Sequence, residues 1–138
     1  MKNMKLPALI LLLVLLPASA IASEQKKSAA AEEAGKWLAL VDGRQHQQSW
    51  QRAATLFRQQ VSAEQWRQAI SAARNPLGNM VSRKLAAATY ATSLPGAPDG
   101  EYVVLQFSTE FENRKHAIET VTPMLDNGQW RVSGYYVR

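Results

Sequence analysis

The feature that most constrains the fold is the last stretch of the chain, Glu101 to Arg138, which reads as three strands joined by two short turns. Within it the segments EYVVLQFSTEF, HAIETVTPML and QWRVSGYYVR carry apolar side chains in near alternation with polar ones. That pattern is typical of strands with one buried face. The stretch therefore predicts a three-stranded antiparallel meander whose apolar face other elements must cover.

The two turns decide which side chains face the core, because a shift of one residue turns a strand over. A two-residue loop at Asn113-Arg114 predicts that Phe107 pairs with Thr120 and Leu105 with Thr122. At the second turn a two-residue loop would place Arg131 among apolar side chains. We therefore expect a three-residue Asp126–Gly128 loop, closed by Gly128 in the left-handed region.

This register predicts one apolar face and one mixed face. The predicted core face holds Val103, Leu105, Phe107, Phe111, Ile118, Met124, Trp130, Val132 and Tyr136. The predicted opposite face holds Gln106, Ser108, Glu110, Glu119, Arg131, Ser133 and Tyr135, with Val104, Val121 and Val137 between them.

Three helices are expected before the sheet. The first runs from about Ala29 to Val41, and the second carries Trp50, Ala53, Ala54 and Phe57 on one side. The third begins at Ser62, where Gln65 completes a capping box, and ends before Pro76. The aromatic residues on these helices are read as core rather than as a ligand box.

A further strand from about Met80 to Thr92 and a loop over Ser93–Gly100 lead into the meander. The order predicts an α+β domain in which three N-terminal helices pack on a four-stranded antiparallel sheet. Its architecture would be a cone of the nuclear-transport-factor-like type or, as the rival, a cystatin-like sheet around one helix.

The N-terminus has the form of a secretory signal peptide. A short basic stretch precedes the apolar run Leu6–Leu16, and Ala18-Ser19-Ala20 and Ala20-Ile21-Ala22 both fit a cleavage pattern. The apolar run is shorter than the ~20 residues of a spanning helix. We expect residues 1–22 to be a removed leader, residues 23–138 to form one domain, and the protein to be exported to the periplasm or outside the cell without a membrane span.

Composition excludes several kinds of site. The chain has 16 basic and 11 acidic residues, and Lys2 and Lys5 leave with the leader, so the mature balance is 14 − 11 = +3. The arginines are scattered, and a nucleic-acid partner is not expected. Cysteine is absent, which removes thiol nucleophiles and zinc–thiolate sites. The two histidines, His46 and His116, form no metal-binding motif, and no cofactor or metal is expected.

The most interesting carboxylate is Glu119, in the middle of a predicted strand. It could be an acid–base or ligand-binding group, or a charge paired with Arg83 or Arg131. His116 lies three residues away on the same strand, so the two side chains project to opposite faces and cannot form a dyad. Arg83, Glu119 and Tyr135 are the candidate ligand-binding residues, and no catalytic residue is assigned.

A series of motifs resembles one family. They include VSAEQW at Val61–Trp66, RNPLG at Arg74–Gly78, PDGEY at Pro98–Tyr102 and WRVSGY at Trp130–Tyr135, and they extend over nearly the whole mature chain. The chain is similar to the uncharacterised bacterial exported family filed as domain of unknown function 4019. The resemblance implies a small envelope protein and assigns no activity, and it marks Arg74 together with Arg83, Glu119 and Tyr135 as positions to test.

The functional expectation follows from the absence of a catalytic set and from the predicted apolar face. We expect a non-catalytic exported module that binds a small apolar molecule or another envelope protein. The alternatives are a small acid–base enzyme of isomerase, dehydratase or hydrolase type that uses Glu119, and a structural protein that self-associates through the mixed face or the last strand.

Overall fold

All the helices of the protein lie on one face of a single antiparallel sheet. The computed structural model describes residues 2–5 and 7–138. The elements are α1 (Ala18–Asp42), α2 (His46–Arg52), α3 (Thr55–Gln60), α4 (Ala63–Arg74), the 3-10 turn η1 (Asn75–Leu77), β1 (Met80–Ala91), β2 (Tyr102–Phe111), β3 (Arg114–Asp126) and β4 (Gln129–Val137). The strands follow one another in the order β1-β2-β3-β4, so β1 and β4 are the edges. The predicted α+β class is confirmed.

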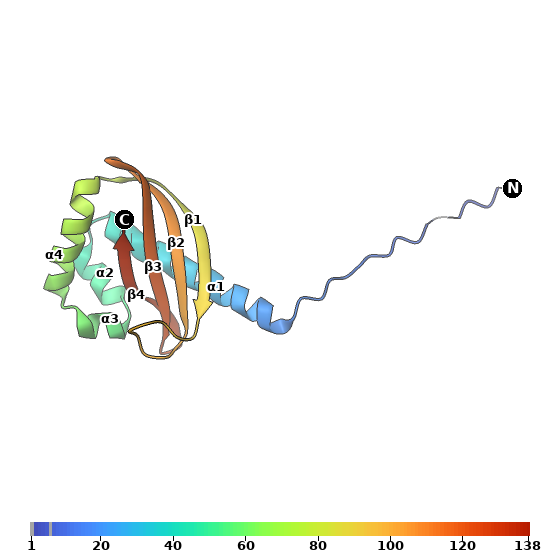
Figure 1. Ribbon diagram of the computed structural model, residues 1–138, viewed down its shortest axis with the longest axis horizontal. Coiled ribbons are helices and arrows are strands. Elements are labelled where there is room, and N and C mark those ends of the chain that lie inside the picture. Colours follow the sequence, from blue (N-terminus) through green and yellow to red (C-terminus); the bar gives the residue numbers. More distant parts are fainter. Residues whose placement is uncertain (1, 6) are drawn as a thin grey trace.

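Helix α1 crosses behind the sheet and contacts all four strands (Figure 1). Its buried residues recur at helical spacing and are Ala30, Ala34, Trp37, Leu38 and Val41. The helix begins eleven residues earlier than expected, since Ala18 rather than Ala29 is its first residue. The alanine-rich lead-in after the leader contains Glu, Gln and Lys, which favour helix, and it continues the same helix outward.

The predicted second helix is two short helices. Ala53 and Ala54 have extended backbone geometry and separate α2 from α3. The break lets the Ala54 N–H donate to the Val132 carbonyl oxygen of β4 at 2.8 Å. A tertiary hydrogen bond therefore overrides the helical pattern, and the backbone group that it satisfies would otherwise be buried unpaired.

Helix α4 starts as the sequence predicts. The Ser62 side chain accepts from the Gln65 N–H, and the Gln65 side chain accepts from the Ser62 N–H. The helix ends at Arg74, immediately before Asn75-Pro76.

The predicted pairing of β2 with β3 is wrong by one residue. Phe107 pairs with Glu119 and Leu105 with Val121, in place of Thr120 and Thr122. The turn is Glu112-Asn113, and Lys115 and His116 together lie opposite Glu110 as a β-bulge. The one-residue change turns β3 over, so Glu119 and Val121 face the helices while Ile118 is exposed.

The second turn also differs from the expectation. Asp126 pairs with Gln129, which leaves a two-residue Asn127-Gly128 loop with both residues at positive φ, 50° and 78°. Trp130 and Val132 face the core as predicted. A bulge at Ser133, beside Pro123 of β3, then reverses the last part of β4. Tyr135 packs against the core, whereas Tyr136 is 53% exposed.

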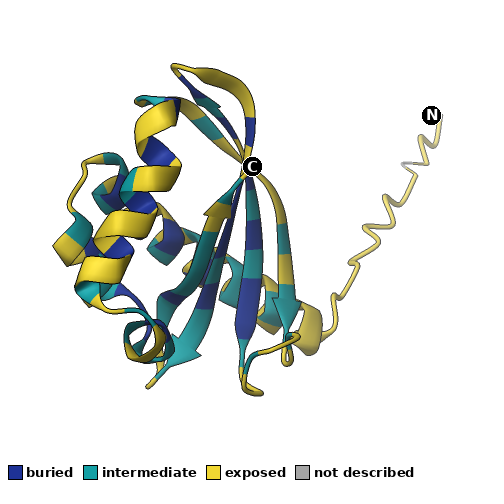
Figure 2. Cartoon of the chain, turned by 60° about the vertical axis from the view of Figure 1, so that its left-hand side comes forward, coloured by how far each residue is buried: buried dark blue, intermediate teal, exposed yellow. Residues whose placement is uncertain are grey.

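These registers give a filled apolar core between the sheet and the helices (Figure 2). Trp37 lies at its centre, with ring centroids 5.6 Å from Trp66 and 5.5 Å from Tyr135. Within the part of the chain that the structure describes, the other face of the sheet carries no helix. The expected oily interior is interrupted at one end, where polar residues meet.

Candidate functional site

A buried carboxylate, Glu119, is the centre of a polar cluster at the end of the core. Its residue is 0% exposed, because the bulged register of β3 directs its side chain under the helices. Thr109 on β2 donates to Oε1 at 2.6 Å and Tyr135 on β4 donates to Oε2 at 2.5 Å. A buried charge is tolerated only when such partners surround it.

Two arginines supply the positive charge. Arg83 on β1 places Nε 2.7 Å from Glu119 Oε1, and its two terminal nitrogens lie 2.8 and 2.9 Å from the oxygens of Asp42. Arg74, the last residue of α4, donates to Asp42 at 2.9 Å and stacks on the ring of Phe111, 4.6 Å from its centroid. Two carboxylates and two guanidinium groups thus balance one another, and we call these four residues the ionic cluster.

The surroundings shift the pKa values of Asp42 and Arg83 in the direction that keeps both groups charged. Burial opposes the charge on Arg83, but hydrogen bonds to Asp42 and Glu119 outweigh it and raise the pKa of Arg83. Burial likewise opposes the charge on Asp42, and hydrogen bonds from Arg83 and Arg74 lower its pKa. Burial, followed by the charge of Glu119, raises the pKa of Tyr135 far above its ordinary value, so this hydroxyl stays a donor.

The cluster joins four elements of the fold. Asp42 ends α1, Arg74 ends α4, Arg83 lies on β1 and Glu119 on β3. Both Glu119 oxygens accept hydrogen bonds from the protein, and neither is exposed to a substrate. An acid–base catalyst needs a carboxylate within reach of the reacting proton. The geometry suits a permanent fastening between helices and sheet better than proton transfer.

The structure brings together all three sequence-predicted site residues, Arg83, Glu119 and Tyr135. Of the two arginines expected to pair with Glu119, Arg83 forms the contact. Arg131 lies elsewhere and donates to the Arg52 carbonyl oxygen at 3.4 Å. The register partners of Glu119 are Phe107 on β2 and Val137 on β4.

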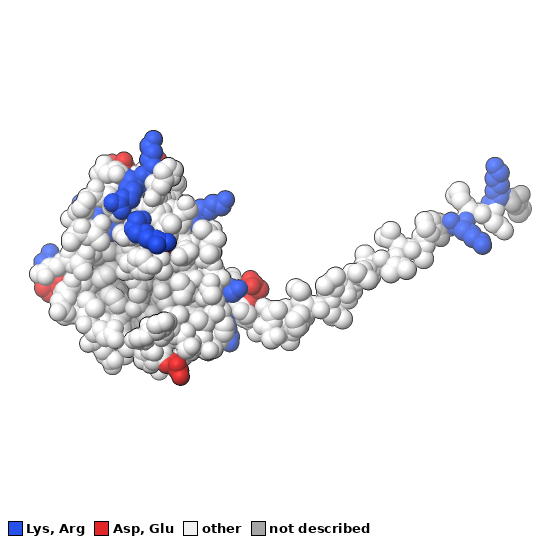
Figure 3. All heavy atoms as spheres, viewed as in Figure 1, with Lys and Arg blue, Asp and Glu red and all other residues white. Residues whose placement is uncertain are grey.

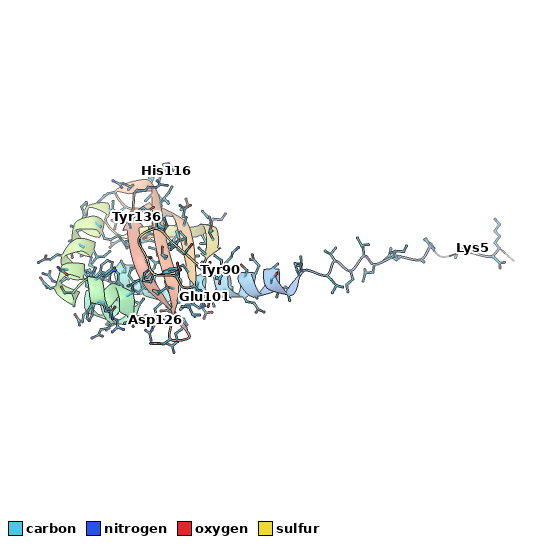
Figure 4. All side chains as sticks on the ribbon, turned by 60° about the horizontal axis from the view of Figure 1, so that its bottom comes forward. Lys5, Tyr90, Glu101, His116, Asp126 and Tyr136 are labelled. Atoms are coloured by element: carbon cyan, nitrogen blue, oxygen red, sulfur yellow. The ribbon has the colours of Figure 1, made fainter. Side chains whose placement is uncertain are left out.

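Sequence reasoning missed two members of this site. Asp42 reads as a helix-stop residue and Thr109 as one more polar residue of an alternating strand. The arginines on the elements that follow α1 indicate that Asp42 has candidate ion-pair partners. Which arginine it pairs with depends on how α1 crosses β1, and the sequence does not give that crossing. His116 is exposed near the β2–β3 hairpin (Figure 4).

An apolar slot beside the edge strand is the second feature of interest. It has a volume of about 240 Å³ and lies between α4 and β4, where Trp66, Ala69, Ile70 and Ala73 face Tyr135, Tyr136 and Val137. Ala69 and Ala73 are exposed and one helical turn apart, so this side of α4 presents small side chains to the slot. We call this feature the α4–β4 slot.

Fold and site together define a small α+β domain with a closed ionic cluster and an open apolar slot at one sheet edge. Residues 33–135 match the family model described as "Protein of unknown function (DUF4019)", and the chain belongs to this family. No curated protein and no solved structure matches the chain. The nuclear-transport-factor-like or cystatin-like architecture therefore stays a prediction.

Among the described residues, no helix combines the length and apolarity needed to cross a membrane.

Proposed function

We propose that this protein is a non-catalytic, exported binding module that holds an extended segment of another envelope protein in the α4–β4 slot. The single observation that carries the proposal is the coincidence of this apolar slot with a free strand edge. A segment that adds to such an edge gains backbone hydrogen bonds, and alternate side chains enter the neighbouring hollow.

The free edge is short and well defined. Ile118 and Arg138 exchange backbone hydrogen bonds in both directions, at 2.9 and 3.0 Å. Because pairing groups alternate along an antiparallel strand, Tyr135 and Val137 direct their N–H and C=O groups away from β3. Further back the edge is closed, since the Val132 carbonyl oxygen accepts from Ala54. The open part thus extends over residues 134–137 and lies beside the slot.

The size and openness of the slot favour a protein segment over a small apolar molecule. Pockets that enclose a small ligand measure ~300–1,000 Å³ and bury most of its surface. The α4–β4 slot is smaller, at about 240 Å³, and is partly open to solvent. An extended segment needs only to place two or three aliphatic side chains over the alanines of α4.

The charge of the surface beside the slot indicates which residues flank the apolar part of the partner segment. Lys and Arg side chains gather at the upper end of the globular part, where the hairpin and the C-terminus lie (Figure 3). Arg114, Lys115 and Arg138 are exposed, and within the described residues none of them has an ion-pair partner. A segment with acidic residues beyond its apolar part would complement this end.

The rival enzymatic reading has less support. A catalytic Glu119 would need an opening to substrate, but its residue is 0% exposed and its oxygens are engaged by Arg83, Thr109 and Tyr135. Tyr135 in turn is a fixed donor to Glu119. The hydrogen bonds that bring these residues together also occupy their polar groups, so these groups are not open to a substrate.

A photo-crosslinking residue at position 73, introduced in the cells that make the protein, tests the proposal. We expect crosslinks to one partner at position 73 and none at position 72, which is exposed on the same helix but outside the slot. Mass spectrometry of the adduct should identify an extended apolar segment, and Ala69→Arg should abolish the crosslink. Equal crosslinking from both positions, or crosslinks that survive Ala69→Arg, would contradict the proposal. Adducts with a second copy of this chain alone would show self-association instead.

A further inference from the structure

A second pocket lies between α1, the end of α2 and the start of β4. Its volume is about 450 Å³, and its lining includes Glu33, Arg52, Gln129, Trp130 and Arg131. None of these residues lines the α4–β4 slot. Pockets for small ligands measure ~300–1,000 Å³, so there is room for a small organic molecule. We call this feature the α1–β4 pocket.

Hydrogen bonds fix two guanidinium groups in the wall of the α1–β4 pocket. Arg52 donates from Nε and Nη2 to the two oxygens of Glu33, at 2.7 and 2.9 Å, which joins α2 to α1. Arg131 donates to the side-chain oxygen of Gln129 at 2.8 Å and to the Arg52 carbonyl oxygen at 3.4 Å. Groups that are already held in place lose less conformational entropy when a ligand binds.

The charges that line the pocket leave one positive charge without a counter-charge. Glu33 pairs with Arg52, and Lys36 pairs with its neighbour on α1, Glu32, at 3.4 Å. Arg131 forms no ion pair within residues 2–5 and 7–138. A ligand with one negative charge would therefore complete the balance.

Arg131 also has donors to spare. A guanidinium carries five N–H groups, and two of those on Arg131 donate, to Gln129 and to the Arg52 carbonyl oxygen. Asp126, an acidic residue of the same hairpin, instead accepts from the N–H and the hydroxyl of Thr55, at 2.8 and 2.9 Å. The guanidinium of Arg131 is thus available to a carboxylate from outside the chain.

Trp130 supplies an aromatic surface to the same pocket. Its ring is half-buried and packs against the core. The indole N–H groups of the other three tryptophans donate to protein oxygens at 2.7–2.9 Å. No described residue accepts from the indole of Trp130, and its nitrogen is not fully buried. An apolar group can pack on such a ring while the N–H donates to water or to a ligand.

We propose that the α1–β4 pocket binds a small organic acid, whose carboxylate contacts Arg131 and whose apolar body packs on Trp130. The planar fork of a guanidinium matches a carboxylate in shape as well as in charge. A basic ligand would meet the charge of Arg131, while Glu33 is already held by Arg52. Because the pocket and the α4–β4 slot share no lining residue, this proposal and the proposed function can fail separately.

An NMR titration of the ¹⁵N-labelled chain tests the site with phenylacetate and its neutral counterpart, phenylacetamide. We expect phenylacetate to shift the indole N–H signal of Trp130 until the signal saturates, and Trp130→Phe identifies that signal. Phenylacetamide should bind at least about tenfold more weakly, because it lacks the charge that Arg131 recognises. Equal affinity for the two compounds, no saturable shift at Trp130, or shifts confined to Trp66 in the α4–β4 slot would overturn the proposal.

A substitution of Arg131 tests its contact with the carboxylate. Arg131→Gln should weaken phenylacetate binding at least about tenfold and leave phenylacetamide binding unchanged, which shows that the pocket itself is intact. Arg114→Gln is the matched control, because Arg114 is an exposed arginine at the start of β3, outside the pocket, and it should keep both affinities. Unchanged phenylacetate binding in Arg131→Gln, or an equal loss in the control, would refute the contact.

Discussion

Glu119 carries a full charge within the core, and its neighbours determine whether that charge stabilises the fold. Arg83, Thr109 and Tyr135 together occupy its two oxygens, and Arg83 is in turn held by Asp42. Removing one member of such a network costs more than the network contributes, because the other charges stay buried without partners. The residue-scale predictions follow from this asymmetry.

Glu119→Gln should lower the free energy of unfolding by about 3 kcal/mol, since it leaves the buried Arg74 and the half-buried Arg83 with Asp42 as their only carboxylate. Urea unfolding followed by tryptophan fluorescence measures the change. The control is Glu32→Gln, whose exposed side chain pairs with Lys36 at 3.4 Å and should matter by less than about 0.5 kcal/mol. Equal effects in the two variants would show that the cluster does not fasten the fold.

The raised pKa of Tyr135 predicts that the free energy of unfolding falls at alkaline pH. Burial and the charge of Glu119 raise its pKa in the folded state, so its contribution is complete below the ordinary tyrosine value near pH 10. Above that pH the unfolded chain releases a proton that the folded chain keeps, and stability falls by up to about 1.4 kcal/mol per pH unit. Urea unfolding between pH 9 and 11 should show a shallower fall for Tyr135→Phe. Tyr136→Phe, at the exposed neighbouring position, should retain the slope.

At the scale of elements, the two ends of α4 are readable from sequence, whereas the start of α1, the break between α2 and α3 and the bulges are not. The Ser62–Gln65 capping box and Asn75-Pro76 predict both ends of α4, because each acts through local backbone chemistry. The bulges at Lys115-His116 and Ser133 each add one residue with no marked change in composition. They reverse the faces of β3 and of the end of β4. Glu119 and Tyr135 could therefore be selected as polar strand residues, but their meeting inside the core could not be foreseen.

Glycine-to-alanine substitutions in the Asn127-Gly128 turn and in the middle of α1 should have opposite effects on the stability of the fold. Gly128→Ala should destabilise by about 1 kcal/mol, because φ of 78° suits glycine alone. Gly35→Ala should stabilise by about 0.5–1 kcal/mol, since Gly35 lies in α1 and an added Cβ meets nothing within 4 Å. Thermal unfolding of the two variants gives the comparison. A stabilising Gly128→Ala would contradict the positive φ at Gly128, and with it the two-residue turn.

At the scale of the whole molecule, the early start of α1 links the domain to the expected leader. Tyr90 donates to Glu101 at 2.8 Å (Figure 4). Lys26 donates to the same carboxylate at 2.6 Å, so the helix is tied to the sheet near residue 26. None of the described residues before Ala30 is buried. The folded domain thus depends on α1 from about Lys26 onward, and the expected cleavage sites lie outside that part.

Truncation tests whether the folded domain depends on α1 only from about Lys26 onward. The chain that begins at Ser23 should unfold within about 0.5 kcal/mol of the full chain, because Ser23 is a suitable N-cap and Glu24 favours the first turn of the shortened helix. A chain that begins at Gly35 loses Ala30 and Ala34 from the core and should be less stable by at least about 2 kcal/mol. Circular dichroism during urea unfolding measures both. If the two truncations were equally stable, the first part of α1 would contribute nothing to the core. If removal of residues 1–22 alone unfolded the domain, the leader would be a structural part of it.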